Sequence, residues 1–308
     1  MVHESVRILE DRALRNPIVI AGFASQSGTT AAAVIDHIVE RWGGTAFAEV
    51  DAEEYFDFTV RRPFVQLEGE HRVLQWPVSR LYVASPEALD RDIVLLSGVE
   101  PSLRWRSFSE AVASLLAEIG ATTFVTVAAY PGAVPHTRPL PVRLDGADTE
   151  FTRPFGIEPT ASAYEGPVGI TSVISLALQA RGIETVSLTA LTPFYAVADP
   201  HPHATTALVE ALDRGLGTST ALGEVRDRAL QLDGDVATAI EESPQLRTVV
   251  TTLEEQYDWM HGTKTALLGA PAEAALVLPS GEEAILDVER FLEEQRGGTS
   301  AADGPPFA

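Results

Sequence analysis

Four polar segments of the sequence carry residue types that could bind or act on a ligand. The first is GFASQSGTT, in which Ser25, Ser27 and Gly28 precede an expected helix. Backbone N–H groups at a helix N-terminus bind phosphate or carboxylate groups. The same residues could instead serve only as the helix cap, because serine and glycine are both favoured there. The orders G-x-G-x-x-G and G-x-S-x-G are absent here, so neither a dinucleotide fingerprint nor an esterase nucleophile elbow is supported.

The second segment is GVEPSLRWRSF, residues 98–108, which places Glu100, Arg104 and Arg106 around the start of another expected helix. Glu100 could form an ion pair with one of the arginines and so fix the turn. The Pro-Ser pair that follows Glu100 suits a helix start. We favour this structural interpretation over ligand binding for the segment.

The third segment is YPGAVPHTRPLPV, residues 130–142, in which His136, Thr137 and Arg138 lie between prolines. It follows an expected buried strand, and ligands of parallel sheets bind beyond the carboxyl ends of the strands. Proline restricts the backbone, so these side chains are held in a fixed presentation. His136 could be a general acid or base and Arg138 an anion clamp. Alternatively, the loop is rigid and its side chains bind backbone carbonyls.

The fourth segment is PFYAVADPHPH, residues 193–203, where Tyr195 follows another expected strand. His201 and His203 are two positions apart, which is poor spacing for a metal site on a helix, and the sequence offers no third ligand nearby. No EF-hand loop or H-E-x-x-H zinc motif occurs. We therefore expect neither a metal ion nor a cofactor.

The composition narrows the classes of protein further. The chain has 308 residues and no cysteine, so disulfides, thiolate nucleophiles and cysteine-ligated zinc are excluded. Its net charge of −22 repels nucleic-acid phosphate and anionic lipid. No apolar run approaches the ~18 residues of a membrane span, and the first residues lack an apolar signal core. We expect a cytoplasmic protein with neither nucleic-acid nor membrane partners.

Strands and helices alternate along most of the chain. Apolar runs predict buried strands at 17–23, 92–97, 122–129 and 184–191, and shorter strands at 45–50, 64–67, 72–76 and 80–84. Apolar stripes predict helices at 29–42, 105–119, 170–181 and 205–216. This alternation predicts an α/β fold with a mostly parallel sheet flanked by helices on both faces.

The pattern changes after Gly217, where strand signals stop. We therefore expect an α/β core domain over 1–218, a small all-helical C-terminal domain over 222–295 and a disordered tail over 297–308. The last of three expected helices lies near 285–292. The helical part is rich in acidic residues, which we interpret as a solvated surface rather than as an acidic docking face.

Several stretches together resemble the proteasome assembly chaperone 2 family, in its bacterial branch. The resemblance runs in family order from about residue 15 to residue 295. The stretches are RRPFV (61–65), GVEPSLRWRSFSEAV (98–112), VPHTRPLPV (134–142), TPFYAVADPHPHATTALVEAL (192–212), TTLEEQYD (251–258) and LPSGEEAILDVERFL (278–292).

The resemblance implies an α/β core related to nucleoside phosphorylases and peptidyl-tRNA hydrolases, and self-association, with a trimer as the first expectation. Relatives help to assemble or bind the proteasome core, and no enzymatic activity follows for the bacterial branch. The leading interpretation is a non-enzymatic chaperone-like or scaffold protein that acts through protein–protein contacts. The alternative is a small-molecule enzyme or sensor whose cleft is lined by Ser27, His136, Arg138 and Tyr195.

The sequence departs from the family pattern in two places. Relatives carry Gly-aromatic-x-Asp-Ala-Gly at the first loop, whereas residues 22–27 read GFASQS and lack the aspartate. Some archaeal relatives end in a tail with a penultimate tyrosine that plugs pockets on the proteasome ring. This chain ends Pro306-Phe307-Ala308. Phe307 lacks the hydroxyl that the tyrosine uses in those relatives, so the resemblance suggests ring activation by that route only weakly.

Overall fold

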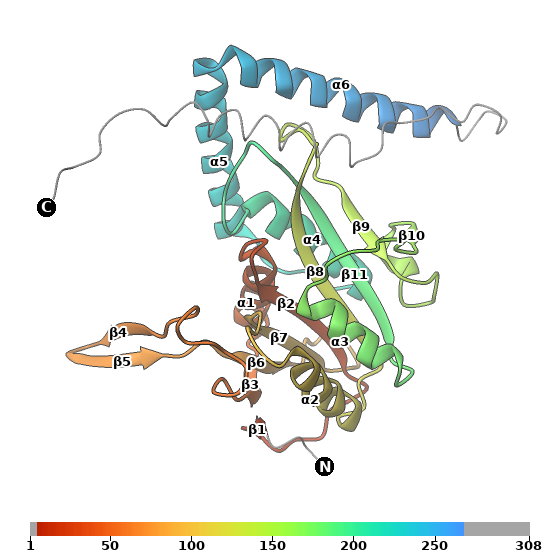
Figure 1. Ribbon diagram of the computed structural model, residues 1–308. Coiled ribbons are helices and arrows are strands. Elements are labelled where there is room, and N and C mark those ends of the chain that lie inside the picture. The colour runs from red at the N-terminus through yellow and green to blue at the C-terminus, as the bar shows by residue number, and fades with distance from the viewer. Residues whose placement is uncertain (1–4, 268–308) are drawn as a thin grey trace, which may run out of the picture. The chain divides into compact units, whose positions relative to one another are not determined.

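A nine-stranded sheet organises the protein, in the order β1-β3-β6-β7-β2-β8-β11-β9-β10 (Figure 1). The computed structural model describes the backbone of residues 5–267 and the side chains of residues 5–260. The strands are β1 (Val6–Ile8), β2 (Ile18–Ala24), β3 (Thr45–Val50), β6 (Ser79–Ala84), β7 (Ile93–Val99), β8 (Thr123–Gly132), β9 (Val142–Asp145), β10 (Pro159–Thr160) and β11 (Glu184–Pro193).

Four parallel strands, β7, β2, β8 and β11, form the centre of this sheet. Antiparallel strands flank them, with β6, β3 and β1 on one side and β9 on the other. The short connection 85–92 between β6 and β7 contains no helix, and a parallel crossover needs a longer connection. β6 and β7 are therefore antiparallel. The predicted α/β fold is confirmed, and its sheet is mixed with a parallel centre. The two edge strands, β1 and β10, are only three and two residues long.

Helices cover both faces of the sheet, as the sequence predicted. They are α1 (Thr30–Trp42), α2 (Trp105–Glu118), α3 (Ile170–Gln179) and α4 (Pro202–Leu216). Alternate residues of a strand point to opposite faces. In β2, Val19 and Ala21 accordingly join the core under α2 and α3, whereas Ile18 and Ile20 join the core under α1 and α4. A short 3₁₀ turn, Arg153–Phe155, lies between β9 and β10.

Two further helices follow the sheet, α5 (Gly223–Glu242) and α6 (Pro244–Leu267). The chain divides into two compact units, residues 1–254 and 255–308, and α6 crosses that division. Val225 of α5 belongs to the core under α1 and α4, so α5 is packed with the first unit. The predicted domain boundary at 218–222 stays a prediction. The helix expected near 285–292 and the tail expected at 297–308 lie outside the described residues.

No helix within residues 5–267 combines the length and the apolar character needed to cross a membrane.

A separate two-stranded ribbon, formed by β4 (Phe64–Glu68) and β5 (His71–Gln75), stands apart from the large sheet (Figure 1). Every residue of both strands is exposed. At its base the ring of Trp76 packs edge-on against Phe58, with 4.8 Å between the ring centroids. We call residues 60–76 the arm.

A buried aspartate fixes the segment that leads into β2. Asp92 is 1% exposed, and its carboxylate accepts hydrogen bonds from the Arg15 main-chain N (2.7 Å), the Arg15 guanidinium (2.9 Å) and the Ser85 hydroxyl (2.7 Å). Burial alone would raise the pKa of Asp92, but these hydrogen bonds, with those from Arg15 strongest, outweigh it and hold the pKa at about 2.

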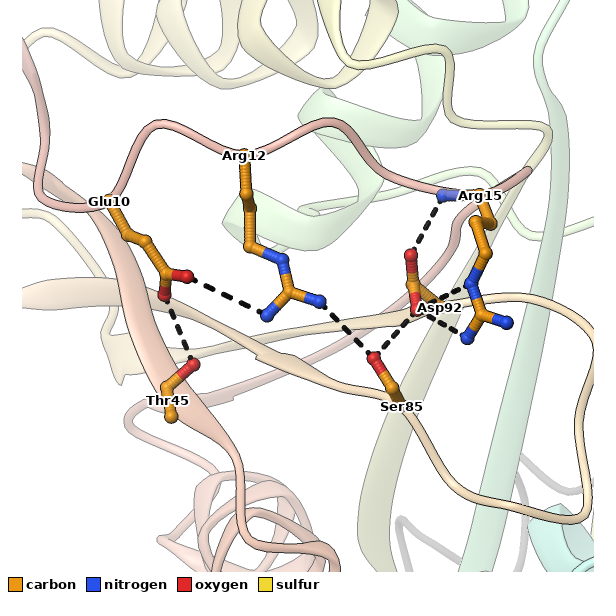
Figure 2. A network of polar contacts seen from close by, with 6 residues as sticks. All are labelled: Glu10, Arg12, Arg15, Thr45, Ser85 and Asp92. Atoms are coloured by element: carbon orange, nitrogen blue, oxygen red, sulfur yellow. Dashed lines mark hydrogen bonds and ion pairs between the residues drawn. The ribbon is translucent and has the colours of Figure 1, made fainter.

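The same network continues toward the start of β3, as Figure 2 shows. Arg12 donates to the Ser85 hydroxyl (3.3 Å) and lies 3.8 Å from the Glu10 carboxylate, which accepts a hydrogen bond from Thr45. The segment before β2 is thereby tied both to the β6–β7 connection and to β3.

We predict that Asp92→Asn lowers the free energy of unfolding by about 2 kcal/mol at pH 7, because the folded state stabilises the charged carboxylate. A carboxylate with a depressed pKa contributes stability that is present above its unfolded pKa and is lost as the pH falls through its folded pKa. The difference between wild type and variant should therefore shrink from pH 5 toward pH 2 in urea titrations. Asp90→Asn, at a side chain that is 96% exposed, is the control. A gap that stays constant with pH would contradict the prediction.

Candidate functional site

The carboxyl ends of β2, β8 and β11 lie side by side, and the first, third and fourth polar segments begin there. A cavity of about 220 Å³ opens at this edge of the sheet. Ser27 and Gly28 line it from the loop after β2, and Phe194, Asp199 and His201 line it from the loop after β11. This is the place where parallel α/β sheets generally bind ligands.

The N-terminus of α1 is occupied by a carboxylate of the protein itself. Asp199 Oδ1 accepts hydrogen bonds from the Thr29 main-chain N (2.6 Å) and the Thr29 hydroxyl (2.7 Å). Gly28 has φ +116°, and a Cβ there would lie 3.1 Å from the same oxygen. The positive end of the helix dipole stabilises the negative charge of Asp199. Its carboxylate also accepts from a main-chain N–H group that has no partner within the helix. The position that the sequence offered to an external anion is thus filled by Asp199.

The start of α1 packs tightly against β2, and the loop between them is closed by its own hydrogen bonds. Gly22 in β2 has no room for a side chain, because a Cβ would lie 2.2 Å from the Ala31 carbonyl oxygen of α1. The Ser25 hydroxyl accepts a hydrogen bond from the Ser27 main-chain N (3.1 Å), and Ser25 also pairs with Gly28 through main-chain hydrogen bonds. Ser25 therefore shapes the turn, while Ser27 and Gly28 face the cavity.

His136 is bonded to Tyr195. The Tyr195 hydroxyl accepts a hydrogen bond from the His136 main-chain N (2.9 Å) and lies 2.8 Å from Nδ1 of the ring. Since the hydroxyl already accepts from the amide, it can donate its proton to Nδ1, which leaves the ring proton on Nε2. Burial lowers the pKa of His136 and raises the pKa of Tyr195, so both side chains are neutral at pH 7.

Thr137 and Arg138 both contact Glu254 of α6. The Thr137 hydroxyl donates to the Glu254 carboxylate, and the Arg138 guanidinium lies 3.6 Å from it. Nearby, His203 of α4 is bonded to Asp233 of α5 (2.7 Å).

We call this group of residues the polar seam: His136, Thr137, Arg138, Tyr195, His203, Asp233 and Glu254. It joins the loops after β8 and β11 to α4, α5 and the first part of α6. The sequence proposed four of these residues, His136, Thr137, Arg138 and Tyr195, as candidate ligand-binding groups. However, His136 and Tyr195 are bonded to each other, and Thr137 and Arg138 contact α6, whereas Ser27 and Gly28 line the cavity.

Glu100 and Arg104 lie apart from both the cavity lining and the seam. The sequence suggested an arginine as the partner of Glu100, but its carboxylate accepts a hydrogen bond from the Ile170 main-chain N (2.8 Å) at the start of α3. Arg104 adopts a left-handed conformation (φ +51°) at the start of α2 and pairs with Glu54 (3.3 Å). Both residues therefore organise the beginnings of helices.

Asp199 and His201 are among the cavity residues that sequence reasoning did not select for it. His201 is 4% exposed, its main-chain N donates to the Thr30 hydroxyl (2.9 Å), and its Nδ1 accepts from Ala204 N (3.4 Å) at the start of α4. Burial lowers its pKa to about 4, and the nearby His203 adds to the shift. The signal in the sequence was Asp-Pro-His-Pro before a helical stripe, which is typical of a helix start.

Among the described side chains, no group of three or more His, Asp or Glu residues is arranged to hold a metal ion.

We predict that Asp199→Ala lowers the free energy of unfolding by about 1–2 kcal/mol, because α1 loses its capping carboxylate. The variant also leaves the helix N-terminus open, so acetate or sulfate should stabilise it more than wild type at matched ionic strength. Urea unfolding followed by circular dichroism measures both effects. Asp148→Ala removes a solvent-exposed carboxylate and serves as the control. Equal stability of wild type and variant would contradict the capping role.

A second prediction follows from the neutral, buried His201. Because its folded pKa is depressed, protonation favours the unfolded chain below about pH 6.5, and stability is lost progressively down to about pH 4. Wild type should lose about 3 kcal/mol more than His201→Asn between pH 7 and pH 4, since asparagine also caps helices but does not titrate. His71→Asn on the arm is the control. Parallel stability curves for wild type and His201→Asn would overturn this assignment.

The comparisons with known proteins agree with the fold and with the sequence motifs. Residues 19–240 match the PAC2 family. A PAC2 family protein from Streptomyces avermitilis is 37% identical over 72% of this chain and 95% of that chain, with a TM-score of 0.65. A proteasome-assembly chaperone homologue from Mycobacterium tuberculosis is 33% identical over 76% of this chain and 99% of that chain, with a TM-score of 0.66.

A more distant likeness supports the fold alone. Pyrococcus furiosus PbaB, an archaeal proteasome activator, is 16% identical over 78% of this chain and 99% of that chain, with a TM-score of 0.61. A comparison with curated proteins finds no match. The family match covers most of the chain, and two relatives exceed 30% identity, so the chain belongs to the PAC2 family, as its motifs predicted.

Proposed function

We propose that this chain is a non-enzymatic, chaperone-like scaffold that acts through protein–protein contacts in the cytoplasm. The proposal rests on one observation: the groups that a reactive site would need are already bonded to other groups of the protein. Asp199 fills the helix N-terminus, Tyr195 holds His136, and Glu254 neutralises Arg138. Their positions support a framework that stabilises helices rather than one that binds an anionic substrate.

The proposed partners are proteasome-related proteins and further copies of this chain. The names of two similar structures, a proteasome-assembly chaperone homologue and an archaeal proteasome activator, support the first part. The net charge of −22 disfavours unspecific clustering, so self-association needs a specific interface. A homotrimer remains the first expectation for the assembly.

A second candidate function is a small-molecule sensor or enzyme, and one observation favours it. The cavity of about 220 Å³ lies at the carboxyl ends of three parallel strands, and His201 is one of its lining residues. The buried Nε2 atom of His201 has no hydrogen-bond partner among the described residues. The cavity's apolar lining and hydroxyl groups suit a small uncharged molecule better than a phosphate.

The test is reconstitution. We predict that the purified chain, mixed with purified proteasome α- and β-subunits, co-migrates with an assembly intermediate on native gels and increases the yield of the core particle. An unrelated protein of similar acidic charge is the control. The absence of both effects would contradict proteasome assembly as the function. A large rise in melting temperature with nucleosides, and none with subunits, would favour the second candidate.

A further inference from the structure

The arm exposes more large apolar side chains than any other short segment among the described residues. Phe64 is 75% exposed and Leu67 is 73% exposed. Five other apolar side chains of the arm are also largely accessible, and they are Val60, Val65, Val73, Leu74 and Trp76. Clustered exposed apolar side chains of this kind mark interaction sites.

These side chains occupy both faces of the ribbon. The register pairs Val65 with Leu74, and residues directly opposite in an antiparallel pair share a face. Phe64 lies on the other face, opposite Gln75. β4 and β5 pair only with each other, and a two-stranded hairpin alone is marginally stable in water. Covering its faces would therefore stabilise the arm as well as bury apolar surface.

The arm offers a partner apolar surface on both of its faces. Its seven apolar residues are each 37–75% exposed, so a second copy that covers the ribbon removes apolar surface from water at several positions at once. The ring of Trp76 stands on Phe58 and joins the arm to the packed core, so the ribbon is anchored at its base.

The charge of the arm differs from that of the rest of the chain. It carries the three arginines Arg61, Arg62 and Arg72 against the two glutamates Glu68 and Glu70, on a chain whose net charge is −22. Two copies of so acidic a protein repel each other wherever their acidic surfaces meet. The arm is a place where a second copy can approach without that repulsion, and its arginines are attracted to the acidic surface of that copy.

We infer that the arm docks on a second copy of this chain and forms the contact between protomers. The inference rests on the proposed function as a protein-contact scaffold and names one partner and one surface for it. Burial of the apolar side chains supplies the affinity, and the arginines orient the approach of the two copies.

The experiment measures mass in solution by light scattering at ~10 μM, a concentration at which an interface of micromolar or better affinity is populated. We expect an oligomer for wild type and a monomer for Phe64→Ser/Leu67→Ser. The matched control is Leu176→Ser/Leu230→Ser, which removes two comparably exposed leucines from α3 and α5 and should keep the oligomer. Circular dichroism spectra should be the same in all three proteins, because these side chains lie outside the core.

A second variant tests the role of charge. Arg61→Glu/Arg62→Glu/Arg72→Glu should dissociate the oligomer at low salt, and added salt should partly restore it by screening the repulsion. A monomeric wild type, or an arm variant that keeps the wild-type mass, would overturn the inference. Neither result depends on proteasome subunits, so this failure is distinguishable from failure of the proposed function in the reconstitution assay.

Discussion

The arrangement of the strand ends depends on one contact, the pair of hydrogen bonds that Thr29 donates to the Asp199 carboxylate. These residues are separated by 170 positions in the sequence, yet they connect the loop after β2 with the loop after β11. The neighbouring bond from His201 to the Thr30 hydroxyl reinforces the connection. Because α1 and α4 begin at these loops, one carboxylate sets the start of one helix beside the start of the other.

In the polar seam, side-chain contacts likewise connect distant segments, here including the helices that follow the sheet. His136 and Tyr195 satisfy one another, and Thr137 and Arg138 hold Glu254. These side chains are only partly covered, since Arg138 is 33% exposed and Glu254 is 28% exposed. Asp233 is bonded to His203, and Glu254 contacts Thr137 and Arg138, so α5 and the first part of α6 each have a polar contact with a neighbouring element.

Local patterns allowed most of the fold to be predicted from the sequence. The apolar stripe of residues 29–42 and the glycine pair after it gave α1 within a residue, and short apolar runs gave the central parallel strands. The antiparallel direction of the outer strands was not predicted, because pairing direction depends on how short connections such as 85–92 are routed. The exposure of the arm was also hidden, since alternation in β4 and β5 looks the same whether a strand joins a large sheet or stands alone.

Proline-framed polar residues after buried strands predicted a candidate site near the strand ends, and their role in ligand binding stays a prediction. The loops after β2, β8 and β11 lie together because parallel strands end at a common edge. The partners could not be predicted. Asp199, Asp233 and Glu254 are carboxylates among 44 acidic residues, and only the folded chain shows which of them meet Thr29, His203 and Arg138.

The brevity of the two edge strands has a consequence for how copies of the protein can combine. With only three residues in β1 and two in β10, the large sheet offers a neighbour very few unpaired backbone groups. Strand-by-strand growth from one molecule into the next, the route by which sheet proteins polymerise into fibrils, therefore has almost no template here. Copies of this chain can therefore come close together without the central sheet of one copy seeding aggregation of the next.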